Sequence, residues 1–149
     1  MVRPCHEEDL KLVDAAHRLL VARYREDRHE IGAALRTRDG RVLAAVNVDT
    51  RLRRMGVCAE AIAIGMAAAA GDTRIEVIVA VNREGRVVSP CGACREMIAD
   101  YAPDARVIVP GETGPEEIRA ADLLPLRYHK DGHKDGRKNM RKDELPRQR

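Results

Sequence analysis

Apolar positions near the N-terminus recur with the period of a helix. From about residue 7 to residue 23 they fall three and four apart, which is one face of an amphipathic helix. These positions are Leu10, Val13, Ala16, Leu20 and Val21. The apolar runs 31–35 and 42–46 follow, and between them lies the pair Asp39-Gly40. Because Asp-Gly favours a tight turn, the two runs predict a β-hairpin.

The second half of the chain alternates between helical and strand patterns. Residues 58–70 are Ala-rich and periodic and are closed by Gly71, which predicts a largely buried helix that stops at the glycine. Residues 75–82 are a run of β-branched side chains, typical of a strand covered on both faces. A second helix is expected from Cys91 to about Tyr101, then a strand over 105–109. Alternation of this kind predicts an α/β fold in which these two strands pair in parallel.

Residues 113–124 contain a Thr-x-x-Glu pattern. This spacing is typical of a helix capping box. We therefore expect a last short helix in this segment.

Composition indicates one globular domain with a core of small aliphatic side chains. The chain has 149 residues, of which 44% are hydrophobic and 34% charged, with no Phe or Trp and three Tyr. So few aromatic rings argue against binding single-stranded nucleic acid by base stacking. The sequence has no membrane-length apolar run and no signal-peptide pattern. We expect a cytoplasmic protein whose four cysteines are metal ligands or free thiols rather than disulfides.

The positive charge is concentrated at the C-terminus. Residues 130–149 hold eight Lys/Arg and four Asp/Glu, so the remaining residues sum to 3 − 4 = −1. We expect a catalytic domain over residues 1–129 and a basic, disordered tail over residues 130–149. The body carries no basic excess that would predict nucleic-acid binding.

Two cysteine motifs carry the candidate chemistry, and each lies at the start of a predicted helix. The first is Cys58-Ala59-Glu60, and the second is a Cys-x-x-Cys that contains Cys91 and Cys94. A helix N-terminus favours the thiolate form that binds metal. Three thiolates on Zn²⁺ leave one tetrahedral position open for a reacting water. Glu60 follows Cys58 by two residues, so it can move protons for that water without being a ligand.

Other interpretations of the cysteines are a redox dithiol or a closed structural zinc site completed by Cys5. A structural site gives no reason for a Glu beside the first ligand or for Pro90 before the second. These two features favour the catalytic interpretation. The alternative from a different class is a zinc-stabilised module that binds nucleic acid through the basic tail.

These motifs resemble the cytidine deaminase superfamily. The resemblance spans residues 31–124 and includes the runs Ile31-Gly32-Ala33-Ala34-Leu35, Asn47-Val48-Asp49, Cys58-Ala59-Glu60, Ser89-Pro90-Cys91-Gly92-Ala93-Cys94-Arg95 and Leu123-Leu124-Pro125. It implies a three-layer α/β/α sandwich around a five-stranded mixed sheet. It also implies a homotetramer whose active sites are shared between subunits.

The resemblance further implies the contacts to a small nucleoside or base-analogue substrate. Asn47 and Asp49 are similar in position to the family's ribose contacts. Backbone groups around Ala59 and Ser89 would meet the pyrimidine edge. Tyr128 resembles the C-terminal aromatic residues that blasticidin S deaminases place against their substrate.

Three departures distinguish the chain from ordinary cytidine deaminases. His29 stands where a ring of the pocket is expected, and Ala61 replaces the usual Arg after the catalytic Glu, as in blasticidin S deaminases. Residues 51–54 (Arg-Leu-Arg-Arg) are unusually basic, which indicates either a solvated loop or an acidic group on the substrate. The expected substrate is cytidine, deoxycytidine or an analogue such as blasticidin S. The alternative is another amino-heterocycle, such as a modified pyrimidine, a purine or a triazine.

Overall fold

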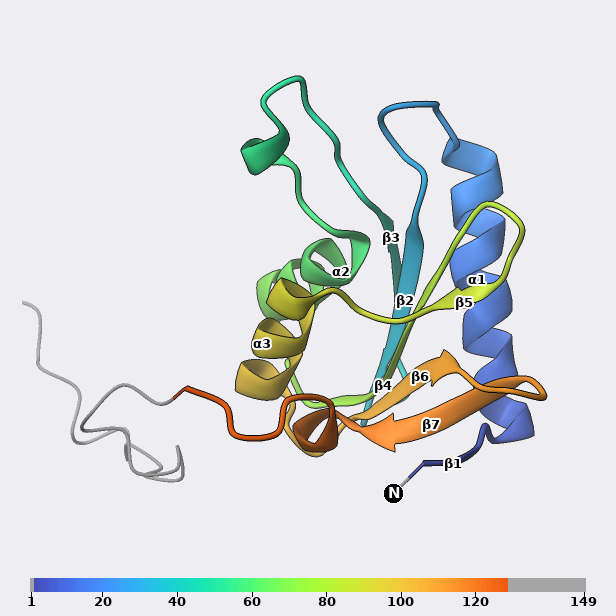
Figure 1. The fold of residues 1–149 in the computed structure, drawn as a ribbon, viewed down its shortest axis with the longest axis vertical. Coiled ribbons are helices and arrows are strands. Elements are labelled where there is room, and N and C mark those ends of the chain that lie inside the picture. Colours follow the sequence, from blue (N-terminus) through green and yellow to red (C-terminus); the bar gives the residue numbers. More distant parts are fainter. Residues whose placement is uncertain (1, 129–149) are drawn as a thin grey trace, which may run out of the picture.

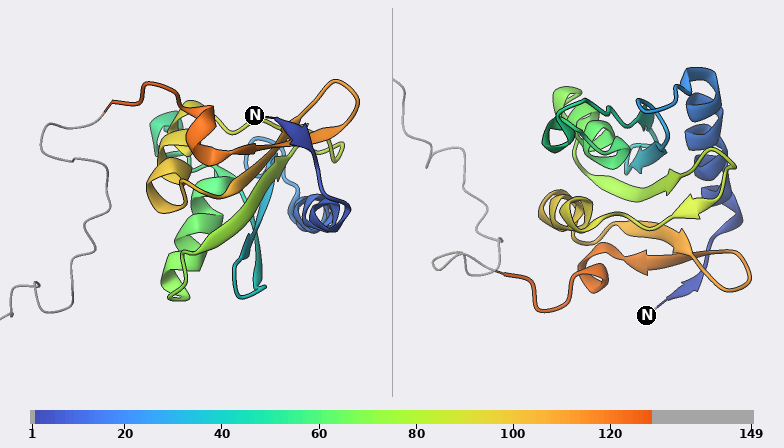
Figure 2. Two further views of the ribbon diagram at one scale, coloured as in Figure 1. Left: turned by 90° about the horizontal axis from the view of Figure 1, so that it is seen from below. Right: turned by 45° about the horizontal axis from the view of Figure 1, so that its top comes forward.

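The computed structural model describes residues 2–128, which form three layers around a mixed β-sheet (Figure 1). The strands are β1 (Arg3–Pro4), β2 (Gly32–Thr37), β3 (Val42–Val46), β4 (Ile75–Val81), β5 (Val87–Val88), β6 (Arg106–Pro110) and β7 (Pro115–Arg119). The helices are α1 (Glu7–Arg23), α2 (Ala59–Ala69) and α3 (Gly92–Tyr101), with 3₁₀ turns at Arg53–Met55 and Ala120–Leu123. Helix α1 covers one face of the sheet, and α2 and α3 cover the other (Figure 2). The α/β/α sandwich is confirmed.

The sheet runs in the order β1-β7-β6-β4-β2-β3, and β5 pairs with β4 off this path. Strands β2 and β3 form the predicted antiparallel hairpin, and β4 and β6 form the predicted parallel pair. The five longer strands correspond to the expected five-stranded sheet. The two additional strands, β1 and β5, are two residues long each.

Strand β4 is buried on both faces, as its β-branched sequence predicts. Val77 and Val79 pack toward α1, where they meet Leu12 and Ala16. Ile78, which points the other way, belongs to the larger core beneath α2 and α3. Alternating side chains of one strand therefore hold both helical layers.

Helix α1 has the predicted length, but its buried face is rotated from the predicted one. Leu12, Ala16 and Leu20 are buried, whereas Leu10 and Val21 are 39% and 60% exposed. The rotation brings Asp9 inside as well, at 1% exposure. Helix α2 ends as predicted, with Gly71 at a φ of +81°, which glycine adopts without strain.

Two expectations were wrong. Residues 113–124 form strand β7 and a 3₁₀ turn instead of a helix, because β7 completes its backbone hydrogen bonds with β6. Helix α2 is not largely buried, since Gly65, Met66, Ala68 and Ala69 are exposed on one side of it. Small side chains do not show from sequence alone which side of a helix faces the core.

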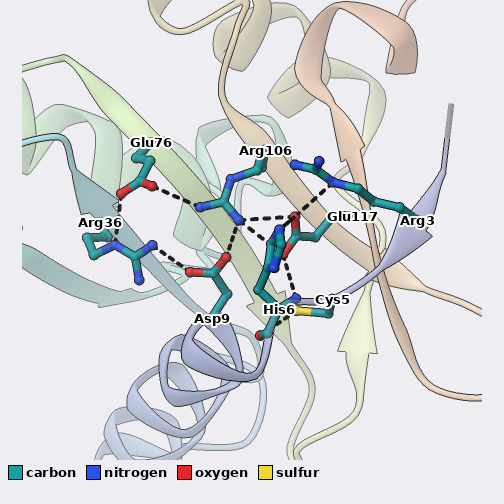
Figure 3. A network of polar contacts seen from close by, with 8 residues as sticks. All are labelled: Arg3, Cys5, His6, Asp9, Arg36, Glu76, Arg106 and Glu117. Atoms are coloured by element: carbon teal, nitrogen blue, oxygen red, sulfur yellow. Dashed lines mark hydrogen bonds and ion pairs between the residues drawn. The ribbon is translucent and has the colours of Figure 1, made fainter.

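A network of paired charges around the buried residues Asp9 and Glu117 lies at the α1 side of the sheet, and it was not predicted (Figure 3). The Asp9 carboxylate accepts hydrogen bonds from Arg36, at 2.6 Å, and from Arg106. Glu76 accepts one bond from each of the same arginines, both at 3.0 Å. The register shift between Arg36 and Thr37 leaves Glu76 as the extra residue of β4.

Glu117 of β7 closes this network and is 1% exposed. It accepts hydrogen bonds from Arg106 at 3.1 Å and from the backbone N–H of His6 at 2.9 Å. Burial opposes the ionisation of Glu117, but these donors outweigh it and lower the pKa of the carboxyl. Helix α1 and strands β2, β4, β6 and β7 are thus joined through paired charges.

No helix within residues 2–128 is long and apolar enough to cross a membrane. The predicted basic tail, 130–149, lies outside the described residues. Nucleic-acid binding through that tail therefore stays a prediction.

We expect Asp9→Ala to lower the free energy of unfolding by about 3 kcal/mol, because removing one partner leaves buried guanidinium groups without their acceptor. Urea denaturation measures the change. Asp14→Ala, at an exposed position of the same helix, is the matched control and should change stability by less than about 0.5 kcal/mol. Equal stabilities of the two variants would contradict the importance given to the network.

Candidate active site

Three cysteine side chains meet where α2 and α3 begin. Cys58 is the N-cap residue of α2, Cys91 is the N-cap residue of α3, and Cys94 lies on the first turn of α3. Their Sγ atoms all lie within 4.8 Å of one another, and those of Cys58 and Cys91 are 3.6 Å apart. Zn–S bonds of about 2.3 Å in a tetrahedron place sulfur atoms about 3.8 Å apart. The three sulfurs therefore fit a zinc ion, and they leave its fourth position to another ligand.

Cys5 takes no part in this cluster. Its thiol contacts the carbonyl of His6 and lies beside Glu117 in the buried charge network (Figure 3). Burial and the neighbouring carboxylates raise the pKa of Cys5 to about 12. The alternative of a closed four-cysteine site is wrong for the described residues.

The thiols differ in how readily they ionise without metal. Burial opposes the ionisation of Cys91, but hydrogen bonds from the backbone N–H of Cys94, from the thiols of Cys58 and Cys94 and from the N–H of Ala93 outweigh it and lower the pKa. Burial raises the pKa of Cys94, and the charges of Glu60 and Cys58 add to the rise. Burial also raises the pKa of Cys58. Of the three thiols, only Cys91 therefore has the lowered pKa that was predicted for a helix N-terminus. Cys58 and Cys94 would be deprotonated when a bound cation stabilises their thiolates.

Glu60 lies beside the cysteine cluster on the first turn of α2 and is 5% exposed. Burial raises the pKa of its carboxyl, while bonds from its own backbone N–H and from Cys94 act in the opposite direction. Such a carboxyl is poised to take up and release protons near the metal.

Ala59 anchors this turn to the sheet. Its side chain is fully buried and packs with Ala33 of β2 and Ala80 of β4, and Ile31 and Val88 border the same cluster. Ser89, the next residue after Val88, is exposed. The backbone around Ala59 and the backbone around Ser89 are thus brought to the same end of the sheet.

Asn47 joins the other predicted substrate residues into one unit. Its Oδ1 accepts the backbone N–H groups of Glu30 and Ile31, at 2.7 and 2.9 Å. Its Nδ2 donates to Asp49 Oδ2 at 3.0 Å, and its backbone carbonyl accepts His29 Nδ1 at 2.7 Å. Both lone pairs of the amide oxygen are used within the protein, so Asn47 holds His29 and Asp49 in position.

This unit adjoins the metal ligands. Val48, between Asn47 and Asp49, exchanges two backbone hydrogen bonds of 2.9 Å with Val57, the residue before Cys58. The fold therefore brings His29, Asn47 and Asp49 to the cysteine cluster. Tyr128 is 81% exposed, so most of its ring faces solvent in a single chain.

Arg95 has a role that our sequence analysis missed. Its Nε donates to the carbonyl oxygen of Pro90 at 2.9 Å. Pro90 itself is buried, and its carbonyl lies just outside the hydrogen-bond ladder of α3. Arg95 is also the only basic residue of α2 and α3. The signal available from sequence was an Arg directly after the second Cys of the Cys-x-x-Cys motif.

We expect Arg95→Met to release Zn²⁺ to a chelator about tenfold faster, because residues that orient metal ligands typically contribute a factor of about 10 to 100 in metal affinity. Arg86→Met is the control, since the backbone N–H and carbonyl of Arg86 pair with Asn82 in the β4–β5 turn, and its side chain forms no hydrogen bond or ion pair within residues 2–128. Release rates can be followed with a chromogenic chelator. If both variants matched the unmodified protein, Arg95 would have no positioning role.

Comparison with known proteins supports the site. Residues 6–110 match the family model described as the cytidine and deoxycytidylate deaminase zinc-binding region. A blasticidin-S deaminase from Bacillus cereus is 40% identical over 133 residues, 84% of this chain and 95% of that protein. A cytidine deaminase from Halalkalibacterium halodurans is 35% identical over 100 residues, 66% of this chain and 76% of that protein.

Solved structures show the same fold. The cytidine deaminase from Mycobacterium leprae superposes with a TM-score of 0.69 at 27% identity, over 81% of this chain and 99% of that chain. The cytidine deaminase from Burkholderia pseudomallei gives a TM-score of 0.68 at 28% identity, over 83% and 100% of the two chains.

Proposed function

We propose a reaction and a set of residue roles for this chain, which belongs to the cytidine and deoxycytidylate deaminase family and is a zinc-dependent hydrolytic deaminase. The proposal rests on one observation above all. The buried carboxyl of Glu60 lies beside three cysteine sulfurs that converge within 4.8 Å of one another.

Cys58, Cys91 and Cys94 would hold the zinc ion. When bound, Zn²⁺ supplies the Lewis acidity that brings the pKa of a water toward about 7. Three sulfur ligands would leave the fourth position of a tetrahedral zinc ion open, as in a catalytic site and unlike a closed structural one.

Glu60 moves the protons of the reaction. Its carboxylate accepts a proton from the attacking water as the water oxygen bonds to the amino-bearing ring carbon. Glu60 passes that proton to the adjacent ring nitrogen, takes up the remaining hydroxyl proton and gives it to the departing amine. The carbon–nitrogen bond breaks, ammonia leaves and the ring keeps a carbonyl oxygen. A general acid and base in this position contributes about 10² to 10⁴ in rate.

The substrate is proposed to be cytidine, deoxycytidine or a cytosine-nucleoside analogue of the blasticidin S type. Asn47 and Asp49 are proposed to contact the sugar, and Asn47 keeps one amide hydrogen for a substrate hydroxyl. The Asn47 carbonyl holds His29, whose ring is proposed to line the pocket. Backbone groups around Ala59 and Ser89 contact the pyrimidine edge. The names of the relatives, a blasticidin-S deaminase and cytidine deaminases, support this substrate class.

We expect Glu60→Gln to abolish ammonia release from cytidine or blasticidin S, with a loss of at least about 10²-fold, while zinc content stays unchanged. An ammonia assay and metal analysis on the same sample measure both. Glu84→Gln, in the exposed turn after β4, is the control and should keep full turnover. Undiminished ammonia release by the Glu60 variant would overturn the proton-transfer role.

The chain is further proposed to work as a homotetramer in the cytoplasm. Its support is the set of exposed apolar side chains on α2 and in the loop before it, among which Leu52, Met55 and Met66 are 57%, 62% and 40% exposed. Surfaces of this kind commonly mark a protein interface. Tyr128 is proposed to reach a substrate site in such an assembly. A reducing cytoplasm would keep the three ligand thiols free.

Sedimentation velocity should give a mass of about 66 kDa, four times the chain mass of 16.6 kDa. Ala68→Glu should shift this mass toward that of the monomer, because it would bury a charge in the interface. Asp14→Lys, at an exposed position of α1, controls for a change of surface charge. A monomeric mass for the unmodified protein would disprove the assembly.

A further inference from the structure

We propose that the domain has a second ligand site, which binds a mononucleotide through its phosphate and its aromatic ring. The site is a hollow of about 480 Å³ whose lining includes Arg3, Arg38, Arg106 and Arg119, and we call it the arginine pocket. It lies away from the cysteine cluster, so the inference goes beyond the proposed function and does not depend on it.

Strand β4 separates the arginine pocket from the active site. Ile75, the first residue of β4, lines the pocket. Ala80, near the other end of the strand, packs with Ala59 beside the metal ligand Cys58. A strand rises about 3.3 Å per residue, so these two residues of β4 lie about 17 Å apart. A ligand in the arginine pocket is therefore distinct from the substrate of the cysteine cluster.

A smaller hollow of about 260 Å³ adjoins the arginine pocket, since both are lined by Arg38, Ile75 and Asp104. Tyr101, at the end of α3, lines this second hollow and is 50% exposed. Sites for small molecules typically measure about 300 to 1,000 Å³. Arginines bind phosphate through parallel hydrogen bonds, and exposed aromatic rings stack on nucleobases. The two adjoining parts therefore match the two ends of a mononucleotide.

The buried side of the arginine pocket consists of charges that are already paired with one another (Figure 3). Glu76 accepts hydrogen bonds from Arg36 and Arg106, both at 3.0 Å. Glu117 accepts from Arg106 at 3.1 Å and from the backbone N–H of His6 at 2.9 Å. Both carboxylates are thus occupied by donors of the protein, which makes them poor ligands for a cation and gives this side of the pocket a fixed shape.

The other arginines of the pocket are exposed and less completely paired. They come from three separate segments, with Arg3 on β1, Arg38 in the β2–β3 turn and Arg119 at the end of β7. The side chain of Arg38 forms no hydrogen bond or ion pair within residues 2–128. Arg3 contacts Glu117 at 3.5 Å, and Arg119 contacts Asp122 at 3.2 Å. These guanidinium groups keep N–H donors for a ligand.

The charge of the lining favours an anion. Four arginines stand against Glu76, Asp104 and Glu117, so the lining sums to 4 − 3 = +1, whereas residues 1–129 as a whole sum to −1. Asp104 lies 3.9 Å from Arg119, which is longer than a hydrogen bond. A hollow with a local positive excess concentrates anions, and a phosphate group matches the fork of a guanidinium group.

Isothermal titration calorimetry of the zinc-loaded full chain tests the site with three probes. These are adenosine 5′-monophosphate (AMP), adenosine and ribose 5-phosphate. A purine is used because the proposed substrate of the cysteine cluster is a cytosine nucleoside. AMP should bind at least about tenfold more tightly than either smaller probe, since it alone supplies both the phosphate and the ring.

Two variants divide the site into its parts. Arg38→Gln combined with Arg119→Gln should weaken AMP binding about tenfold, the sum of two exposed charge contacts. Tyr101→Ala should weaken AMP binding by a similar factor through loss of stacking and should leave the affinity for ribose 5-phosphate unchanged.

The matched control is Arg51→Gln combined with Arg54→Gln, which removes the same charge from exposed positions in the loop before α2. This control should keep the affinity of the unmodified protein for AMP. An unchanged Tm and an unchanged zinc content show that each variant is folded.

Three results would overturn the inference, and none of them bears on the deaminase reaction. The first is the absence of saturable AMP binding below about 10 mM. The second is an affinity that falls in the Arg51 and Arg54 variant and not in the Arg38 and Arg119 variant, which would place the nucleotide near the cysteine cluster. The third is equal affinity for AMP and for either smaller probe, which would remove the phosphate contact or the ring contact.

Discussion

The active site depends on close packing between the first turn of α2 and the centre of the sheet. Ala33, Ala59 and Ala80 are all buried at this contact, and their small side chains allow the helix backbone to approach the strands. The residues on either side of Ala59 are Cys58 and Glu60, a metal ligand and the proposed proton carrier. A larger side chain at any of these positions would displace both groups together, since protein interiors adjust little to added volume.

The two cysteines at the start of α3 are positioned by a hydrogen bond instead of by packing. Cys91 and Cys94 stand on α3, whose start is reached from β5 through Ser89 and Pro90. Arg95 binds the Pro90 carbonyl from within the helix, so α3 fixes the segment that leads into it. Two helix N-termini are thereby held side by side, and the three sulfurs meet there.

Charge is distributed over the domain according to function. In the network on the α1 side of the sheet every charge has an opposite partner, and Asp9 and Glu117 are buried there. Its members are Asp9, Arg36, Glu76, Arg106 and Glu117. Arg51, Arg53 and Arg54, in the loop before α2, form no ion pair within the described residues. Paired charges can be buried at moderate cost, whereas unpaired ones must remain exposed to water or to a charged ligand.

Local sequence patterns were enough to identify the cysteines as metal ligands, to place the two ends of α1 and to predict β4 as a strand. Ligand spacing and side-chain periodicity are properties of neighbouring residues. The same patterns also predicted Glu60 as the proton carrier and the order of α1, β2, β3, α2, β4, α3 and β6 along the chain. Tertiary structure alone decided that residues 115–119 pair with β6 as a strand, since that choice depends on a partner elsewhere in the chain. Tertiary structure alone also placed Asn47 where it binds both His29 and Asp49. It buried Asp9 against Arg36 and Arg106. It left one side of α2 exposed to solvent. Each of these depends on contacts between residues far apart in sequence, which no local pattern encodes.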